Sequence, residues 1–149
     1  MFKKFLLLAS AGLMAIGPAV AAEKVKIGFV TTITTPAGVI GKDMVDAVNL
    51  AMEDIGGKMA GLDVELIVED DGFKPAIGKQ KTDKLVKQDK VQFVTGFIWS
   101  HVLLASQKSA LGAGKFLISS NAGPSQMAGK LCHKNFFSTS WQNDQTPMA

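Results

Sequence analysis

Short apolar segments alternate with segments of helical periodicity along most of the chain, and this alternation constrains the fold more than any single motif. Segments rich in Val, Ile, Leu and Phe and bounded by Gly, Asp, Thr or Ser predict strands at residues 25–30, 62–69, 91–95, 115–119 and 136–139. Between them, apolar residues recur at helical spacing, which predicts helices over residues 39–55, 75–88 and 100–111. The alternation is typical of right-handed βαβ units. The predicted class is therefore α/β, a doubly wound parallel sheet with helices on both faces.

Residues 1–22 carry the pattern of an export signal. Lys3 and Lys4 precede an apolar run over residues 5–16, and the small residues at 19–21 suit a signal peptidase. The alternative is a membrane-anchoring helix, but an apolar run of about a dozen residues is shorter than the roughly 20 that span a bilayer. We therefore predict a signal peptide over residues 1–22.

Cleavage of this signal is expected near Ala21 or Ala22, which leaves residues 23–149 as the mature chain. That chain would be periplasmic and would not be embedded in the membrane. Its length is about that of one domain.

The charge pattern of the mature chain argues against nucleic acid as a partner. All 16 basic residues are lysines, two of them in the signal, so the remaining lysines nearly balance the 13 acidic residues. The lysines are spread along the chain, and no arginine is present to make the forked contacts typical of nucleic-acid grooves.

Cys132 is the only cysteine, so the sequence contains no internal disulfide even though an exported chain could hold one. We expect its thiol to be free and buried. The alternative is a disulfide with a cysteine outside this sequence.

Three loops are candidates for a binding site. In an open α/β sheet, ligands bind beyond the carboxyl ends of the strands, where loops lead into helix N-termini. The loops at residues 31–38, 96–101 and 119–125 leave predicted strands at this edge and are rich in hydroxyl groups and glycine. Helix N-termini present unpaired N–H donors with positive dipole character, so a carboxylate is the expected guest.

Four side chains in these loops have both a structural and a functional interpretation. Ser100 is either a plain helix N-cap or a ligand donor. Thr34 and Thr35 are either turn residues or ligand contacts, and Trp99 either packs in the core or stacks on an apolar or ring-bearing ligand.

No catalytic or metal-binding set is visible in the sequence. Ser100 and His101 lack the flanking glycines of a nucleophile elbow, and Cys132 and His133 lack the second pair of ligands that a zinc site needs. No glycine-rich phosphate-binding motif follows the first strand. We expect no enzymatic activity, no metal and no cofactor.

Asp70 and Asp71 resemble the acidic cation site of a receiver domain, but such a site also needs an aspartate at the end of the third strand. That strand ends in Thr95 and Gly96 instead. We therefore expect the two aspartates to form a helix-capping turn.

Three blocks of the sequence resemble a known family: KIGFVTTITTPAGVIGKDMVDAVNLAMEDIGGKMAG, VEDDGFKPAIGKQKTDKLVKQDKVQFVTG and FLISSNAGPSQMAG. In these blocks the chain is similar to the N-terminal part of type I periplasmic solute-binding proteins. The most similar group is the branched-chain amino acid (leucine/isoleucine/valine) receptors of ABC transporters. The resemblance implies a type I lobe with strand order about 2-1-3-4-5. It also implies that residues 23–149 are an incomplete first lobe of a two-lobe protein, because Asn143 and Asp144 predict the cap of a helix that the sequence carries for barely one turn.

The resemblance further implies a function and a set of contacts. Members of the family close two lobes on a small solute and deliver it to an inner-membrane ABC permease. Their first-lobe contacts match Ser100, Asn121 and Gly123, with neighbours Ser120 and Ala122, which would hold a ligand carboxylate. The alternative function is a ligand-sensing ectodomain of a signalling receptor with the same fold.

The sequence departs from amino-acid receptors at the loop after the fourth strand, which reads Asn121-Ala122-Gly123-Pro124 in place of a serine, alanine and threonine loop. The run FIWS at residues 97–100 is similar to the subgroup associated with aromatic acids. The expected ligand is thus a branched-chain or other amino acid, or an aromatic acid.

Overall fold

A single six-stranded sheet runs through the computed structural model, which describes residues 23–145. The strands are β1 (Val25–Thr31), β2 (Lys58–Met59), β3 (Leu62–Asp70), β4 (Phe93–Thr95), β5 (Phe116–Ser119) and β6 (Phe136–Ser138). Their order across the sheet is β2-β3-β1-β4-β5-β6, and every neighbouring pair is parallel except β2 with β3. Apart from β2, this is the predicted order 2-1-3-4-5, which is confirmed.

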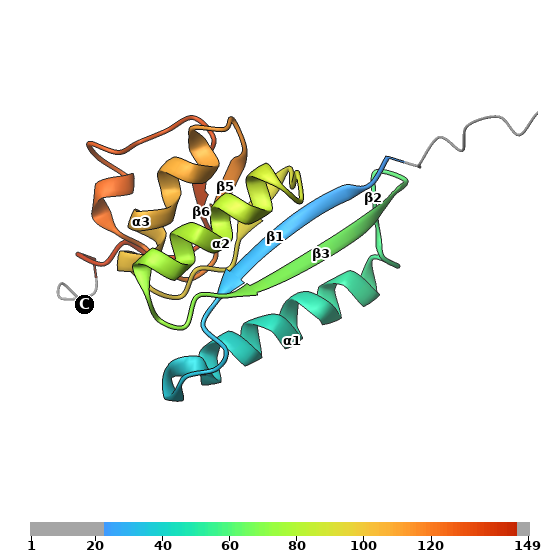
Figure 1. The fold of residues 1–149 in the computed structure, drawn as a ribbon, viewed down its shortest axis with the longest axis horizontal. Coiled ribbons are helices and arrows are strands. Elements are labelled where there is room, and N and C mark those ends of the chain that lie inside the picture. The colour runs from blue at the N-terminus through green and yellow to red at the C-terminus, as the bar shows by residue number, and fades with distance from the viewer. Residues whose placement is uncertain (1–22, 146–149) are drawn as a thin grey trace, which may run out of the picture.

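Three helices connect the strands, each within one residue of its predicted bounds: α1 (Val39–Asp54), α2 (Pro75–Lys87) and α3 (Ser100–Leu111). Short 3-10 turns, η1 (Pro36–Gly38) and η2 (Ser125–Met127), lie in the loops after β1 and β5. Helices cover both faces of the sheet, with α1 on one side and α2 on the other (Figure 1). The alternating residues of β1 follow this arrangement: Gly28 faces Leu85 of α2, whereas its neighbour Phe29 lines a cavity with residues of α1.

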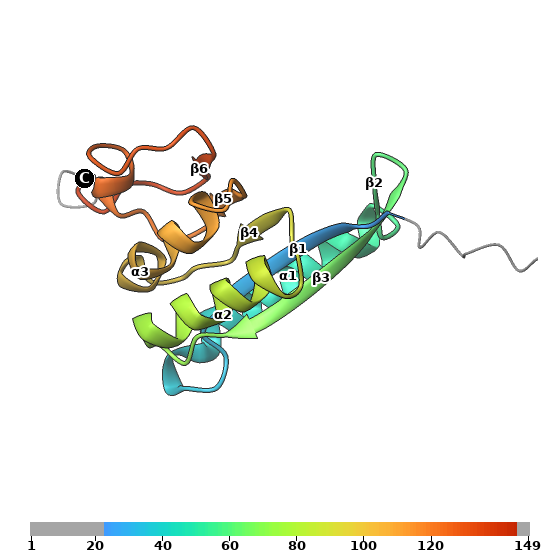
Figure 2. The same cartoon turned by 45° about the horizontal axis from the view of Figure 1, so that its top comes forward.

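The core lies mainly on the α2 and α3 side of the sheet. Side chains from β4, β5 and both helices are fully buried there, among them Leu85, Val94, Leu103 and Leu117. The two helices pack side by side (Figure 2). Gly78 permits this contact, because a Cβ atom at that position would collide with Val102 of α3.

The opposite face, under α1, is much more open. Gly41 is the only fully buried residue of α1, where its backbone lies against the carbonyl of Thr32. Val39 and Leu50 are 67% and 60% exposed. The amphipathic pattern therefore predicts the helix correctly, although its apolar residues are only partly covered by the described chain.

Two sequence predictions are wrong here, and one short strand was not predicted. The Cys132 thiol is exposed, because it lies in an irregular stretch after η2 rather than in a packed element. Asp70 and Asp71 do not cap α2: its N-cap is Lys74, which makes no side-chain cap bond, and both carboxylates bond to the chain after β1. The strand β2 was missed.

Two further predictions fall outside the described residues: the signal peptide over residues 1–22, and the helix expected beyond residue 145. Asn143 and Asp144 themselves lie in a turn. Between residues 23 and 145, no helix has the length and apolar character needed to cross a bilayer.

Candidate functional site

The carboxyl ends of β1, β4 and β5 meet at one edge of the sheet because the three strands are parallel. Gly96, just after β4, has a φ of 98°, and a side chain there would strike the Phe29 ring. Glycine thus lets the chain turn out of β4 across its neighbour β1. The loop that follows leads directly into α3.

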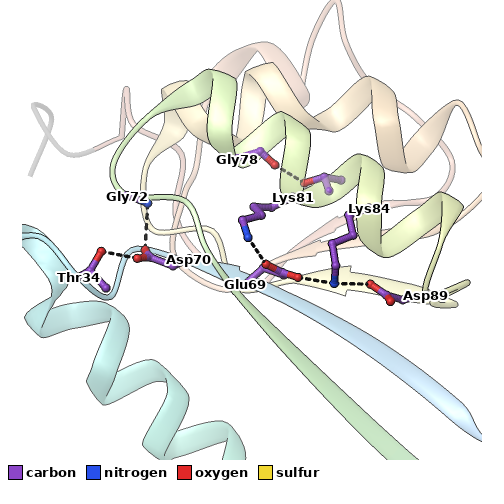
Figure 3. A network of polar contacts seen from close by, with 9 residues as sticks. Thr34, Glu69, Asp70, Gly72, Gly78, Lys81, Lys84 and Asp89 are labelled. Atoms are coloured by element: carbon purple, nitrogen blue, oxygen red, sulfur yellow. Dashed lines mark hydrogen bonds and ion pairs between the residues drawn. The ribbon is translucent and has the colours of Figure 1, made fainter.

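The turn after β1 is fastened to the end of β3 by Asp70 (Figure 3). The carboxylate of Asp70 accepts from the N–H groups of Ile33 and Gly72, each at 2.9 Å, and from the Thr34 hydroxyl. Burial alone would raise the pKa of Asp70, but the hydrogen bonds from Thr34, Gly72 and Ile33 outweigh it and lower the pKa below its usual value. The hydroxyl hydrogen of Thr34 is therefore already used in a bond to Asp70.

Thr35 lies one residue further along the same turn. Its carbonyl accepts from the N–H of Gly38 at 2.8 Å, and its buried hydroxyl has no hydrogen-bond partner among residues 23–145. The structure therefore places both threonines at the predicted edge, with Thr34 acting in the turn itself.

A second aspartate, Asp71, lies fully buried beneath the same edge. Its Oδ1 accepts from the Thr32 hydroxyl at 2.5 Å, and Thr32 in turn accepts from the Trp99 indole N–H at 3.0 Å. Trp99 is half-buried and packs against the core, while Phe73 meets its ring edge-on at 4.8 Å. Sequence analysis did not find the roles of Thr32, Asp71 and Phe73, since side-chain contacts between separate strand ends leave no local pattern.

Ser100 is the first residue of α3, not its cap. The N-cap is Trp99, and no side chain caps the helix. The N-cap interpretation of Ser100 is therefore wrong. Its Oγ accepts from Asn143 Nδ2 at 2.9 Å, which leaves the hydroxyl hydrogen available for an acceptor. Helix N-termini present N–H groups without intrahelical partners, so this point of the edge suits an anion.

The loop after β5 is fastened to the loop after β4. The Ala122 N–H donates to the Phe97 carbonyl at 3.1 Å, and Asn121 Nδ2 donates to the Ile98 carbonyl at 3.0 Å. The Ser119 hydroxyl closes the loop on the Ala122 carbonyl. The Ala122 N–H is thus already engaged, while the Asn121 side chain keeps its oxygen as an acceptor.

Ser120 and Gly123 differ in how accessible they are. Ser120 is exposed at the edge, whereas Gly123 is buried beneath the chain at Trp141, and its carbonyl accepts from the Asn143 N–H at 2.7 Å. Of the eight predicted contacts, Trp99 and residues 120–123 therefore lie in two loops that are bonded together, and Ser100 begins α3 directly after one of them. Thr34 and Thr35 lie in the neighbouring turn.

A cavity of about 380 Å³ adjoins these loops on the α1 side of the sheet. Its walls are mostly apolar and come from β1 and α1: Phe29, Ile40, Met44, Ala47 and Val48. Thr95, Ser120 and Asn121 supply its polar lining. An apolar space with a few polar groups is typical of a site for a small organic molecule.

The described part of the chain shows no group of side chains that could form a metal centre. Within residues 23–145, no three side chains of His, Cys, Asp or Glu are grouped as metal ligands would be.

His101 lies exposed on α3, where the centre of its ring is 5.1 Å from that of Phe73 in an edge-on contact.

Comparison with known proteins places these features in a family. The family model described as periplasmic binding protein matches residues 24–149, almost the whole chain outside the predicted signal. The chain belongs to this family. No curated protein gives a significant match.

Solved structures of ABC transporter binding proteins share the fold of this periplasmic binding protein. An ABC transporter substrate-binding protein from Sphaerobacter thermophilus is 29% identical, with a TM-score of 0.78 over 83% of this chain and 34% of its own. A solute-binding protein of an ABC transporter from R. palustris, in complex with benzoate, is 27% identical, with a TM-score of 0.78 and the same two coverages.

A third similar structure is the branched-chain amino acid transporter substrate-binding protein LivJ from Streptococcus pneumoniae, in complex with isoleucine. It is 26% identical, with a TM-score of 0.74 over 80% of this chain and 34% of LivJ. The chain thus spans about a third of the length of each of these three structures.

Proposed function

We propose that this chain is the first lobe of the substrate-binding component of an ABC transporter, which captures a small carboxylate-bearing solute. One observation carries the proposal: the uncapped N-terminus of α3, with Ser100 at its start, lies beside the Ser120 and Asn121 loop at the sheet edge. Together they offer N–H and hydroxyl donors to an anion beside an apolar cavity. This arrangement suits a molecule with a carboxylate at one end and an apolar body.

In this proposal, residues 1–22 are a cleaved signal peptide and residues 23–149 belong to a lobe that works in the periplasm. A second lobe, absent from this chain, closes over the ligand, and the closed protein docks on an inner-membrane permease. The chain binds its solute without converting it. Two findings support the assignment of residues 23–149 to one lobe of a larger binding protein: the chain belongs to a binding-protein family, and it spans about a third of the length of the similar structures.

The solute class is an amino acid or an aromatic acid. Three of the similar solved structures are complexes with isoleucine, benzoate and 3,4-dihydroxybenzoic acid, all of which carry one carboxylate and a largely apolar or ring-bearing body. The mostly apolar lining of the cavity, which includes the Phe29 ring, suits either kind of body.

Titration calorimetry on the full-length protein with a panel of branched-chain amino acids and aromatic acids tests the proposal. Ser100→Ala is expected to weaken binding of the preferred acid about tenfold, because it removes a donor to a charged group. Ser109→Ala is the matched control, since its hydroxyl lies on the same helix but bonds to Asp83. If no acid on the panel binds, or if Ser100→Ala binds as the wild type does, the site assignment fails.

A further inference from the structure

Three side chains from three strand ends form one hydrogen-bonded chain beneath the binding edge. Trp99 Nε1 donates to Thr32 Oγ1 over 3.0 Å, and Thr32 Oγ1 donates to Asp71 Oδ1 over 2.5 Å. Chemistry fixes the direction, because an indole N–H can only donate and a carboxylate can only accept. The single hydrogen of the Thr32 hydroxyl therefore points to Asp71, and a lone pair of the Thr32 oxygen accepts from the indole N–H.

Burial makes this chain of contacts rigid. Thr32 and Asp71 are both 0% exposed, and Asp71 Oδ1 also accepts from the Phe73 N–H at 2.8 Å. Asp71 Oδ2 has no hydrogen-bond partner among residues 23–145. A buried carboxylate with so few donors is costly to desolvate, so packing stability alone does not account for it.

Trp99 in turn determines where α3 begins. Its carbonyl accepts from the N–H groups of Val102 at 3.1 Å and Leu103 at 3.0 Å, so it supplies the first acceptor of the helix. The next residue is Ser100. Anchoring the indole at Thr32 therefore fixes both the ring of Trp99 and the helix N-terminus beside it.

We propose that Asp71 and Thr32 are positioning residues for the ligand site: Asp71 orients the Thr32 hydroxyl, which holds Trp99 and through it the N-terminus of α3. This inference rests on the proposed function, since the site it positions is the one assigned to the carboxylate. Neither residue touches the ligand. Their effect on affinity passes through the orientation of Trp99.

The test uses the full-length protein, with benzoate and L-isoleucine as probes in calorimetry. Thr32→Val leaves the indole N–H without its acceptor and removes one of the two donors to Asp71 Oδ1. It is expected to weaken binding of whichever probe binds the wild type more tightly by about tenfold. Thr32→Ser retains the hydroxyl and is expected to bind as the wild type does. Thr82→Val is the matched control, because it removes another fully buried threonine hydroxyl, one that bonds only to the Gly78 carbonyl within α2.

A second readout reports on the indole itself. The ¹H–¹⁵N resonance of the Trp99 side chain, assigned by its loss in Trp99→Phe, is expected to move in Thr32→Val but not in Thr32→Ser or Thr82→Val. In the wild type its hydrogen is expected to exchange slowly with solvent, and this measurement does not depend on the Thr32 variants.

The possible results separate the two proposals. If the wild type binds neither probe, the proposed function fails and the positioning role fails with it. If the wild type binds but Thr32→Val binds equally well, or if the indole hydrogen exchanges as fast as that of an exposed tryptophan, only the positioning role is overturned.

Discussion

Asp70 combines a structural role at this edge of the sheet with a shifted pKa. Its carboxylate fastens the turn after β1 to the end of β3 through hydrogen bonds from Ile33 and Thr34, and it also accepts from the Gly72 N–H in its own turn. Together these bonds hold the pKa of Asp70 below its usual value. Because the folded pKa is the lower one, these bonds stabilise the fold fully above about pH 4. Their contribution is lost as the pH falls through the lowered pKa.

Asp70→Asn is accordingly expected to reduce the free energy of unfolding at pH 7 by about 1–2 kcal/mol and to flatten the loss of stability below about pH 4. The amide retains one oxygen for the backbone donors but cannot accept from all three partners. Urea unfolding followed by circular dichroism at pH 7 and at pH 3 measures both effects. Asp46→Asn, at an exposed position of α1, serves as the control, and equal pH profiles for the two variants would contradict the role of Asp70.

At the level of single residues, sequence analysis found the donors near the surface but not the side chains that hold them. Ser100, Asn121 and Ser120 follow predicted strands, so their place at one edge follows from parallel topology. Asp71 contacts Thr32 across 39 positions of sequence. Nothing in either local segment distinguishes that pairing from the expected capping turn.

The helices α2 and α3 pack closely against each other. Gly78 lies at their contact, where an added Cβ atom would overlap Val102 and also meet Ser106 Oγ at 3.4 Å. Backbone and neighbouring side chains must shift to admit a methyl group there, because protein interiors have little free volume.

Gly78→Ala is therefore expected to lower the free energy of unfolding by about 1–3 kcal/mol, even though alanine is the better helix former. Gly129→Ala is the matched control, since a Cβ atom there meets only the Ser125 carbonyl at an ordinary 3.7 Å. Thermal unfolding of both variants beside the wild type gives the comparison. A Gly78→Ala protein as stable as the control would show that the two helices are not held at this distance.

The elements themselves were largely predictable, because the helices are long enough to show their periodicity and the parallel strands, even the three-residue β4 and β6, are apolar segments bounded by turn residues. β2 was not, since two residues cannot show any alternation. The depth of burial of α1 was not predictable either. Periodicity identifies the apolar side of a helix but not how much of that side the rest of the chain covers.

For the molecule as a whole, the open α1 face is the weak point. Val39 and Leu50 point largely into solvent, and only Gly41 of this helix is fully buried. Much of the burial that a 16-residue amphipathic helix usually contributes is absent here. The stability of residues 23–149 by themselves is therefore expected to be marginal.

Residues 23–149 produced alone are accordingly expected to unfold at a lower temperature than the same residues within the full-length protein. Circular dichroism melting of the two chains measures the difference. Equal melting temperatures for the two chains would contradict this reasoning.

Asn143 bonds to both loops of the proposed site, by its side chain to Ser100 and by its backbone to Gly123. Since Asn143 donates to the Ser100 oxygen, a guest that accepts the hydrogen of this serine leaves that bond in place. If the proposed site holds its solute at Ser100, the solute and the position of the chain after β6 are thermodynamically linked through Asn143.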